Sequence, residues 1–540
     1  MYLFNTTAGL RRYLELSRSR QEPFHPDAAR PSDPLSAVRF TVGLVPTMGA
    51  LHAGHLSLIQ RARQENSLVV VSIFVNPLQF APQEDLQRYP KTLDADRRLC
   101  EAAGVDAVFA PSVMEFYGPA DSPAADQVTQ VIPPYLMRSP LCGQTRTGHF
   151  EGVATVVTKL FNLVRPDRAY FGRKDAQQLA ILQRLVRDLN MEVDIVPCPI
   201  IREASGLALS SRNQYLSAPE REAAAAIYRS LQRAEALFRA GTLDGSDLVA
   251  AVLEELASEP LVKPEYVELV HPQTLMPLPQ VKEAGLLAIA ARVGSTRLID
   301  NVVLKARRPI IAIDGPAGAG KSTVAKQVAR QLDLLYLDTG AMYRAITWLM
   351  LQVGVDLRDE PAVAELVSQS QIRLAAAPAQ EGSPATPSCR VWINDQEVTQ
   401  AIRTEAVTSK VSAIAAQPSV RHALVKQQQD CGRNGGIVID GRDIGTHVFP
   451  DAELKLFLTA SVHERARRRQ QDLKNQGQAV LTLEQIEQAI RQRDYQDSTR
   501  AIAPLRKASD AIEIQTDAMS ADEVTAQIVA LYQQTVPATA

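Results

Sequence analysis

Residues 311–345 read "IAIDGPAGAGKSTVAKQVARQLDLLYLDTGAMYRA", and this stretch decides the fold of the second part of the chain. It contains G-x-x-x-x-G-K-[ST] between a strand-like and a helix-like run, which is the context of a phosphate-binding loop. Glycines let the backbone wrap around phosphate, Lys321 brings positive charge to the β and γ oxygens, and the Ser322 hydroxyl can reach Mg²⁺. The ATP-binding residues predicted here are Gly315, Gly318, Gly320, Lys321, Ser322 and Thr323.

A different nucleotide signature lies upstream, in "PTMGALHAGH" at residues 46–55. It predicts a strand, a glycine turn and a helix whose amino end bears His52 and His55, two imidazoles that can donate to phosphate. Alone, this pair is as typical of a structural role as of a ligand site. However, "FGRKDAQQL" adds Lys174, and "LALSSRNQYL" adds further phosphate donors. Such donors without a glycine-rich loop suit attack at the α-phosphate with pyrophosphate leaving.

Length and composition favour a multidomain protein with almost no net charge. The chain has 540 residues, whereas single cores stop growing near ~250–300 residues. Its 58 basic and 60 acidic residues nearly cancel, which argues against general nucleic-acid or membrane binding. The five cysteines lack C-x-x-C spacing, no apolar run approaches the ~20 residues of a membrane span, and the amino terminus has no secretory pattern. We therefore expect a cytoplasmic protein with reduced thiols.

The order of apolar runs predicts an α/β protein with two main domains. Strand-like and helix-like runs alternate over 41–200, which indicates a parallel sheet with crossover helices. We expect a domain at 1–306, with a nucleotide-binding part at about 1–217 and a small α+β subdomain at about 218–305 that opens with an Ala-rich helical stretch. A second α/β domain is expected at 307–540. The Pro- and Ser-rich 17–36 is interpreted as an exposed insertion without a catalytic role.

Arginine-bearing segments follow the glycine-rich loop and indicate a second, acceptor phosphate. Through "GPAGAGKST", "YLDTGAMYRA", "GRDIGTHVFPDAELKLFLTAS" and "RDYQDSTRAIAPLRKASDAI", residues 309–540 resemble the cytidylate kinases, which are P-loop nucleoside-monophosphate kinases. The resemblance implies a CMP-binding insertion at about 355–425 and a lid at about 460–500. It assigns CMP to Thr339, Arg344, Ser412, Arg421, Arg442, Asp443, Arg493, Asp497 and Arg500, with Lys321 and Arg442 catalytic. The run "HERARRRQ" at 463–470 is either a solvated helix face or a set of lid arginines, and the resemblance favours the lid.

Residues 1–305 resemble pantothenate synthetase, a pantoate–β-alanine ligase of the H-x-G-H nucleotidylyltransferase superfamily with a Rossmann-like fold. The similarity is carried by "PTMGALHAGHLSLI", "VSIFVNPLQF", "CGQTRTGHFEGVATVVTKLFNLVRPDRAYFGRKDAQQL", "SGLALSSRNQYL" and "TRLIDN". It implies that pantoate and ATP form pantoyl adenylate and pyrophosphate, and that β-alanine then displaces AMP.

The same resemblance assigns roles to residues of the first half. His52, His55 and Lys174 are expected to be catalytic, and Gln79 and Gln178 to hold pantoate, with Gln79 also near β-alanine. The expected ATP contacts are Met48, Gly49, Ala50, Leu51, His52, Ala53, Gly54, His55, Gly172, Arg173, Lys174, Asp175, Ile201, Leu209, Ser210, Ser211 and Arg212. Two positions depart from the family: Arg173 stands where an acid is common, and Thr147 where proline is common.

Together these features predict a bifunctional enzyme, and a fused ligase–cytidylate kinase family is known. The expected ligands are ATP, pantoate, β-alanine and CMP or dCMP, with Mg²⁺ bound through ATP and Ser322, no nucleic acid and no membrane. A homodimer through the ligase half is expected, since that family is commonly dimeric. Two alternatives remain: a single ligase regulated or powered by its P-loop domain, and a protein related to class I aminoacyl-tRNA synthetases that binds nucleic acid.

Overall fold

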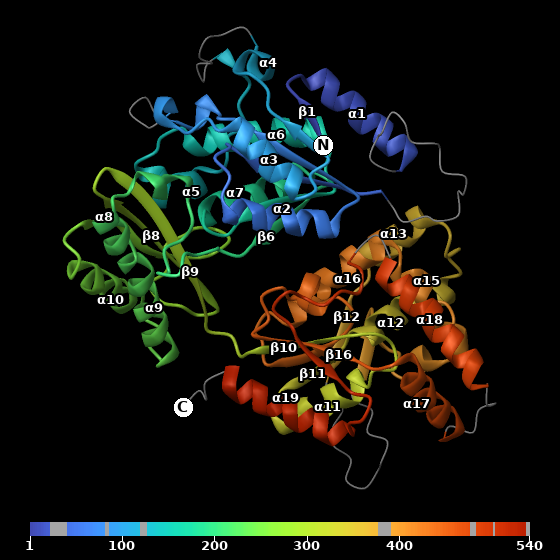
Figure 1. Cartoon of the computed structure of the whole chain (residues 1–540). Coiled ribbons are helices and arrows are strands. Elements are labelled where there is room, and N and C mark those ends of the chain that lie inside the picture. Colours follow the sequence, from blue (N-terminus) through green and yellow to red (C-terminus); the bar gives the residue numbers. More distant parts are fainter. Residues whose placement is uncertain are drawn as a thin grey trace. The chain divides into compact units, whose positions relative to one another are not determined.

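The computed structural model describes residues 1–21, 40–80, 86–118, 127–375, 390–475, 482–499 and 503–535. They form two compact units, Met1–Ala306 and Arg307–Ala540, each built around its own parallel sheet (Figure 1). Almost no chain separates the units: the N–H of Ala306 donates to the Glu283 carbonyl at 2.9 Å. The next residue, Arg307, already pairs with Asp451 of the second unit at 3.1 Å.

The first unit contains a six-stranded parallel sheet in the order β1-β4-β3-β2-β5-β6. Its strands are β1 (Tyr2–Phe4), β2 (Val42–Thr47), β3 (Leu68–Ile73), β4 (Ala107–Phe109), β5 (Arg168–Gly172) and β6 (Asp194–Cys198). The direction of strand succession reverses between β2 and β5, which are neighbours in the sheet. In open α/β sheets, ligands bind at the carboxyl ends of the strands beside such a reversal. The fold therefore places the predicted nucleotide turns after β2 and β5 at one crevice.

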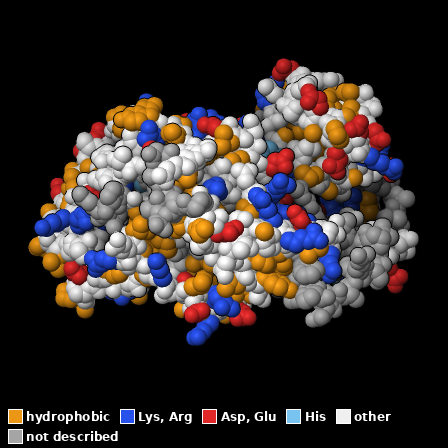
Figure 2. All heavy atoms as spheres, turned by 90° about the horizontal axis from the view of Figure 1, so that it is seen from above, with side chains coloured by type: hydrophobic (Ala, Val, Ile, Leu, Met, Phe, Trp, Pro, Cys, Tyr) orange, Lys and Arg blue, Asp and Glu red, His pale blue; other side chains and the backbone are white. Residues whose placement is uncertain are grey.

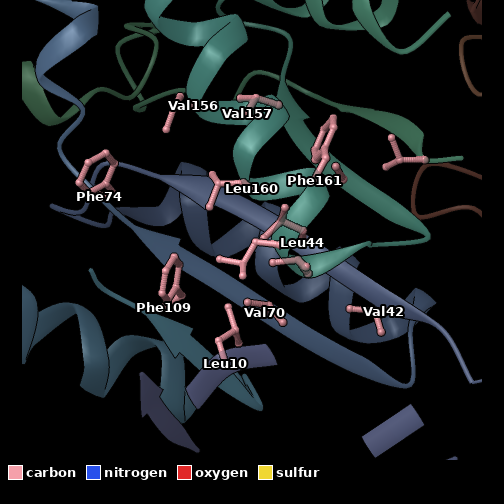
Figure 3. Packing of buried hydrophobic residues seen from close by; sticks show 14 of the residues in the cluster. Leu10, Val42, Leu44, Val70, Phe74, Phe109, Val156, Val157, Leu160 and Phe161 are labelled. Carbon is pink, nitrogen blue, oxygen red and sulfur yellow. The ribbon is translucent and has the colours of Figure 1, made fainter. Parts of the chain in front are cut away.

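Helices cover both faces of this sheet. They are α1 (Thr7–Arg20), α2 (Ala53–Glu65), α3 (Leu93–Ala102), α4 (Val113–Tyr117), α5 (Tyr135–Arg138), α6 (His149–Val164) and α7 (Ala176–Asp188), with the short 3₁₀ turns η1 (Pro77–Gln79), η2 (Leu86–Arg88), η4 (Leu141–Gln144) and η5 (Ser211–Tyr215). The largely apolar α6 lies along one face, where Leu160 and Phe161 pack near Leu44 and Val70 (Figure 3). This core fixes α6, whose first turns approach the predicted substrate residues.

The end of the first unit is a small α+β subdomain. Its elements are α8 (Ala218–Ala224), α9 (Ala226–Arg239), α10 (Gly245–Ala257) and the antiparallel strands β7 (Val262–Val270), β8 (Ala284–Val293) and β9 (Thr296–Lys305). The three helices pack on the strands around a core of their own (Figure 1). The Ala-rich stretch that was expected to be helical forms two helices, α8 and α9, which are divided at Ala225. No glycine or proline marks the division, and the sequence therefore gives no local signal for it.

The second unit has a five-stranded parallel sheet in the order β11-β15-β10-β16-β17. The strands are β10 (Ile310–Asp314), β11 (Leu335–Asp338), β15 (Ile437–Asp440), β16 (Leu454–Thr459) and β17 (Ile512–Gln515), with α11 (Lys321–Gln331), α12 (Thr339–Val353), α19 (Ala521–Thr535) and the π-helical turn η7 (Ile444–Val448) around them. The glycine-rich loop follows the central strand β10. Consequently, the carboxyl ends of β11 and β15 lie beside it.

Two insertions complete the second unit. The first comprises α13 (Glu360–Ser368), the antiparallel strands β12 (Ile372–Ala375), β13 (Arg390–Ile393) and β14 (Gln396–Glu397), the turn η6 (Ala401–Arg403), and α14 (Glu405–Thr408), α15 (Val411–Ala415) and α16 (Pro418–Cys431). The second is a helical pair, α17 (Val462–Asn475) and α18 (Leu483–Thr499), joined by the buried Ala466, Leu473, Ile486 and Ile490. They overlap the ranges 355–425 and 460–500, for which the roles of CMP-binding insertion and lid stay predictions.

Surface and helix composition fit a mixed-charge α/β protein. On the face shown in Figure 2, Lys and Arg side chains are interspersed with Asp and Glu. None of the helices that the structure describes is both long and apolar enough to cross a membrane. The insertion expected at 17–36 falls largely on residues 22–39, outside the described part of the chain.

Candidate active sites

A tight turn between β2 and α2 sets the position of the two histidines. Gly49 (φ +85°) and Ala50 (φ +51°) both adopt the left-handed region, where a residue with a side chain is strained. The buried carboxylate of Asp96 in α3 holds the turn, accepting the N–H of Ala50 at 3.0 Å and that of Leu51 at 2.8 Å. Thr92 donates its hydroxyl to the same carboxylate at 3.1 Å. The strained turn is thus stabilised from a neighbouring helix.

His52 and His55 cap the amino end of α2 reciprocally. Nδ1 of His52 accepts the N–H of Gly54 at 3.1 Å, and Nδ1 of His55 accepts the N–H of His52 at 3.4 Å. Burial, with the charge of Lys174, lowers the pKa of His52 to about 4. Burial, then His52 and Lys174, lowers the pKa of His55 to about 3. Both rings are therefore neutral at pH 7 and carry their proton on Nε2, where it is available to a ligand.

A cavity of about 560 Å³ opens beside the histidines at the carboxyl ends of β2 and β5. This volume is within the usual range for small-molecule sites. Fourteen predicted residues line it: Met48, His52, Gly54, His55, Gln79, Gly172, Lys174, Asp175, Gln178, Ile201, Leu209, Ser210, Ser211 and Arg212. Five others do not: Gly49, Ala50, Leu51, Ala53 and Arg173. Of these, Ala53 is the first residue of α2 and is exposed. Thr147, which departs from the family pattern, is exposed as well.

Lys174 supplies the cationic side of this cavity. Burial lowers its pKa to about 8. The carboxylates of Asp300 and Asp175 oppose that shift, whereas the guanidinium groups of Arg212 and Arg202 strengthen it. Because about 8 is above neutral pH, most Lys174 side chains carry a positive charge at pH 7. The cavity therefore combines neutral imidazole donors with one ammonium group.

Gln79 is oriented by a buried hydrogen-bond network at the end of η1. Asn76 donates its amide to Gln79 Oε1 at 3.0 Å and to the Gly152 carbonyl at 3.0 Å. Tyr117 in turn donates to Asn76 Oδ1 at 2.9 Å. With its Oε1 accepting from Asn76, the Gln79 side chain offers its Nε2–H groups toward the cavity.

His149 holds the backbone of Gln79. Its Nδ1 donates to the Gln79 carbonyl at 2.7 Å, and its Nε2 accepts from Arg146 at 2.9 Å. Burial, together with Arg146, lowers the pKa of His149 to about 3, which agrees with a neutral ring in that tautomer. The first turn of α6 therefore positions Gln79.

A larger cavity, of about 620 Å³, lies elsewhere in the first unit and carries none of these groups. Arg18, Phe161 and Asp167 are among its lining residues. Asp167 precedes β5, so this cavity is at the amino end of the strands. Since α/β sheets bind nucleotides at the opposite end, the 560 Å³ cavity is the candidate nucleotide site of this unit.

Sequence reasoning did not single out several residues around the cavity. Arg146, Tyr89, Arg292, Thr296 and Arg297 line it, and Tyr89 lies 3.4 Å from Ser211 through their hydroxyl groups. The quoted stretches "CGQTRTGHF" and "TRLIDN" contain Arg146, Thr296 and Arg297, which is the signal that could have identified them.

In the second unit, the loop after β10 has the backbone of a phosphate cradle. Gly315 (φ +146°) lies so close to β16 that an added Cβ would be 2.0 Å from the Leu458 carbonyl oxygen. Gly318 (φ +79°) and Gly320 (φ +84°) adopt left-handed conformations. The ammonium of Lys321 donates to the Pro316 carbonyl at 2.7 Å, so it lies inside the loop. The predicted residues thus form one turn at the start of α11, whose second and third residues are Ser322 and Thr323.

Carboxylates surround the loop at the ends of β10 and β15. Asp440 accepts from the Ser322 hydroxyl at 2.6 Å and from the Tyr336 hydroxyl at 2.8 Å, and burial raises its pKa. Asp314 accepts the N–H groups of Ile444 and Gly445, yet burial raises its pKa to about 7. Hydroxyl and carboxylate oxygens are the donors that Mg²⁺ prefers.

Four of the predicted CMP-binding residues form two ion pairs beside the loop. Arg421 is buried and pairs with Asp443, and Nε of Arg442 donates to Asp497 at 2.8 Å. The pKa of Arg421 is raised because the charge of Asp443 and their hydrogen bond outweigh the effect of burial. The guanidinium groups of this set therefore lie in fixed orientations.

The remaining predicted CMP-binding residues differ in their contacts and in their exposure. Thr339 donates to the Asp440 carbonyl at 2.7 Å, and Arg344 pairs with Asp338 at 3.1 Å. Burial and the nearby Arg442 lower the pKa of Arg493. Ser412 is exposed on α15, and Arg500 lies outside the described residues.

The arginines of α17 divide into two groups. Arg465 donates to the Ala317 carbonyl of the glycine-rich loop at 3.1 Å and pairs with Asp494 of α18 at 2.7 Å. Arg467, in contrast, is exposed and pairs with Glu464 on its own helix. Arg465 thus contacts the loop and Arg467 faces solvent, and the interpretation of "HERARRRQ" as lid arginines stays a prediction.

Comparisons with known proteins agree with this division. The family model of pantoate-beta-alanine ligase matches residues 28–303, and that of cytidylate kinase matches residues 311–534. A "Bifunctional pantoate ligase/cytidylate kinase" of Trichormus variabilis is 61% identical over 99% of both chains. Another, of Synechococcus elongatus, is 59% identical over 92% of this chain and 93% of its own. The crystal structure of pantothenate synthetase from Thermus thermophilus is 43% identical over 56% of this chain and 99% of its own, with a TM-score of 0.48.

Proposed function

This chain belongs to the family of bifunctional pantoate ligase/cytidylate kinases, and from that premise we propose that its two sites catalyse separate reactions with the residues described above. The first unit condenses pantoate with β-alanine at the expense of ATP, and the second transfers a phosphoryl group from ATP to CMP. One observation supports the separation most strongly. Each unit has its own sheet and its own set of phosphate donors at the carboxyl ends of the strands.

In the ligase unit, we assign the adenylation step to His52, His55 and Lys174. An oxygen of the pantoate carboxylate attacks the α-phosphorus of ATP, the bond to the β-phosphate oxygen breaks, and pyrophosphate leaves. Neutral imidazoles that donate through Nε2, together with a protonated lysine, stabilise the negative charge that develops on the α-phosphate and the leaving group. His55 is the proton donor to the phosphate oxygens.

The second ligase step uses the other wall of the cavity. The β-alanine amine attacks the acyl carbon of pantoyl adenylate, the bond from that carbon to the AMP oxygen breaks, and the amine gives up a proton as the amide forms. Gln79 and Gln178 hold pantoate through amide hydrogen bonds, and Gln79 also lies near β-alanine. The Asn76 and His149 contacts support this role by fixing both ends of Gln79.

In the kinase unit, catalysis rests on positioning and charge rather than on a covalent intermediate. An oxygen of the CMP phosphate attacks the γ-phosphorus of ATP, and the bond to the β-phosphate oxygen breaks to give CDP and ADP. Lys321 and Arg442 neutralise the transferred group, while Arg421 with Asp443 and Arg442 with Asp497 orient the acceptor. We extend the acceptor to dCMP. Arg465, which already contacts the loop, belongs to the lid that excludes water.

Mg²⁺ is the proposed cofactor of both reactions. In the kinase unit, the hydroxyl of Ser322 and the carboxylate of Asp440 are only 2.6 Å apart, and both are hard oxygen donors that suit this ion. Bound there with ATP, Mg²⁺ would neutralise phosphate charge. Within the described residues, no group of three or more His, Cys, Asp or Glu side chains is arranged to hold a metal. We therefore place the ion on ATP with Ser322.

Paired substitutions test the proposal. Lys321→Ala is expected to abolish CDP formation and to leave pantothenate formation intact, whereas His55→Ala is expected to do the reverse. Both activities are measured on the same full-length preparation, so the retained activity shows that the other unit is folded. Thermal unfolding of each variant shows whether the substituted unit is folded as well. If either variant, still folded, lost both activities, the sites would be coupled, as in the regulatory alternative. Salt-sensitive retention of tRNA would instead favour the nucleic-acid alternative.

We also propose a homodimer formed through the ligase unit and a cytoplasmic location. Sedimentation equilibrium of the full chain tests the dimer, because a monomeric mass across the concentration range would exclude it.

A further inference from the structure

The motif "TRLIDN" at 296–301 belongs to β9 of the small subdomain, and its last two residues contact both nucleotide loops. Asp300 and Asn301 are almost completely buried, at 3% and 6% exposure. Neighbouring residues of a strand point in opposite directions, so two adjacent side chains can reach two different partners. The chemistry described above gives these side chains no role.

Asn301 holds the loop that follows β5. Its side-chain amide donates to the carbonyl of Arg173 at 3.0 Å and to that of Lys174 at 2.9 Å. Both N–H groups of one amide are thus used on consecutive carbonyls, which fixes the peptide plane next to the Lys174 side chain. A shift of this peptide would move the ammonium group within the cavity.

Asp300 holds the other loop, the hairpin 201–209. Its carboxylate binds Arg202 through two hydrogen bonds, of 2.5 and 3.0 Å. Arg202 also donates to the Gly206 carbonyl at 3.1 Å and lies 3.7 Å from the centre of the Tyr228 ring. The hairpin leads into Leu209–Arg212, whose first N–H donates to the Ile201 carbonyl at 2.9 Å. An aspartate of the small subdomain therefore anchors the segment that carries the adenine and phosphate contacts.

We propose that Asp300 and Asn301 are positioning residues for adenylation, which fasten both nucleotide loops to the small subdomain and set the place and charge of the Lys174 ammonium. The proposal rests on the ligase function assigned to this cavity. It implies that the small subdomain takes part in the first chemical step, and not only in covering the site.

The two residues act on Lys174 in different ways. The charged and titratable groups around this lysine are Asp175, Asp300, Arg202, Arg212, His52 and His55. Burial lowers the pKa of Lys174 to about 8, and Asp300 is the foremost group that opposes the shift. Asp300→Asn removes that charge and leaves Arg202 positive, so the pKa of Lys174 falls further. Asn301→Ala leaves every charge in place and releases only the backbone.

Pantoate-dependent exchange of pyrophosphate into ATP isolates adenylation from the β-alanine step. The exchange rate is measured on the full chain from about pH 6 to about pH 10, a range that brackets the Lys174 titration. With Asn301→Ala, we expect the exchange rate to fall on the order of 10²-fold at every pH, as for a misplaced catalytic group, with an unchanged alkaline midpoint. With Asp300→Asn, we expect the alkaline limb, on which Lys174 loses its proton, to begin at lower pH than in the wild type. Asn162→Ala and Asp188→Asn, at exposed helix positions, are the matched controls.

The outcomes separate this inference from the proposed function. If Lys174→Ala retained exchange, the role assigned to this lysine would be wrong, whatever the other variants did. If Lys174→Ala lost exchange while the Asp300 and Asn301 variants behaved like their controls, the positioning role would be overturned. Thermal unfolding accompanies each variant. If Asn301→Ala fails to fold, Asn301→Asp takes its place, because its side chain has nearly the same size but no N–H donors. An exchange rate equal to that of the wild type in this variant also overturns the proposal.

Discussion

Asp96→Asn tests whether the strained turn before His52 depends on a charge in α3. The amide has the size of the carboxylate, but its oxygen can accept only one of the two N–H groups, from Ala50 and Leu51, while its NH₂ group faces the other. A net loss of about 1–3 kcal/mol is typical for one orphaned buried donor, and the remaining bond loses its charge assistance. We therefore expect the ligase unit to lose about 3 kcal/mol of its free energy of unfolding.

Calorimetry of the full chain measures this loss, with the kinase unit as an internal reference. For a unit of 306 residues, about 3 kcal/mol corresponds to a Tm decrease of roughly 5 °C. Because the turn sets the position of His52, kcat/KM for ATP in the ligase reaction falls as well, while the kinase rate is unchanged. Asp94→Asn, on the same helix but exposed, is the control. If Asp96→Asn matched that control in both Tm and kcat/KM, the turn would not depend on this carboxylate.

Three further perturbations address other parts of the structure. In Gly152→Ala, the new Cβ would lie 2.2 Å from the Leu78 carbonyl oxygen, so η1 must move. Initial rates should show the KM for pantoate raised by about tenfold, the equivalent of ~1.4 kcal/mol, and an unchanged KM would contradict the packing argument. Burial lowers the pKa values of three histidines, His52, His55 and His149, to between about 3 and 4. The unfolded chain therefore binds more protons than the folded chain below pH 6.5, and the urea midpoint of the ligase unit should fall as the pH falls from 6.5 toward 4. Equal midpoints over that range would refute this prediction. Arg421→Ala removes one partner of the buried ion pair with Asp443 and should cost the kinase unit about 3–5 kcal/mol in denaturant unfolding. Arg433→Ala, at the exposed pair with Asp430, should cost about 0–1 kcal/mol, and equal losses would show that burial is immaterial here.

Features encoded in short stretches of sequence were predictable. The glycine-rich loop could be placed because strand, glycines, Lys321 and helix follow one another directly, and each requirement of phosphate binding is met locally. The same holds for His52 and His55, which are three residues apart at a helix start. The fold class was confirmed for the same reason, since alternating strands and helices of these lengths form parallel sheets.

Features that depend on distant partners were not predictable. Asp96 meets Ala50 from 46 residues away, and Asn301 meets Arg173 from 128 residues away. Nothing near Asp96 marks it as the partner of the turn at Ala50, and the stretch "TRLIDN" does not indicate which loop Asn301 contacts. Asp96 lies in α3 and Asn301 in the separate β7-β8-β9 sheet, so only the tertiary fold brings each residue to its partner. The break at Ala225 escaped for a different reason: alanine favours helix on both sides of it, and tertiary packing decides where the helix ends.

The junction between Ala306 and Arg307 has a consequence for the cell's supply of the two enzymes. Ala306 is bonded within one unit and Arg307 within the other, so no spare segment is present at which the chain could be divided without loosening a folded part. Each round of translation therefore yields one ligase and one kinase. Expression of this chain therefore supplies the two units in equal numbers.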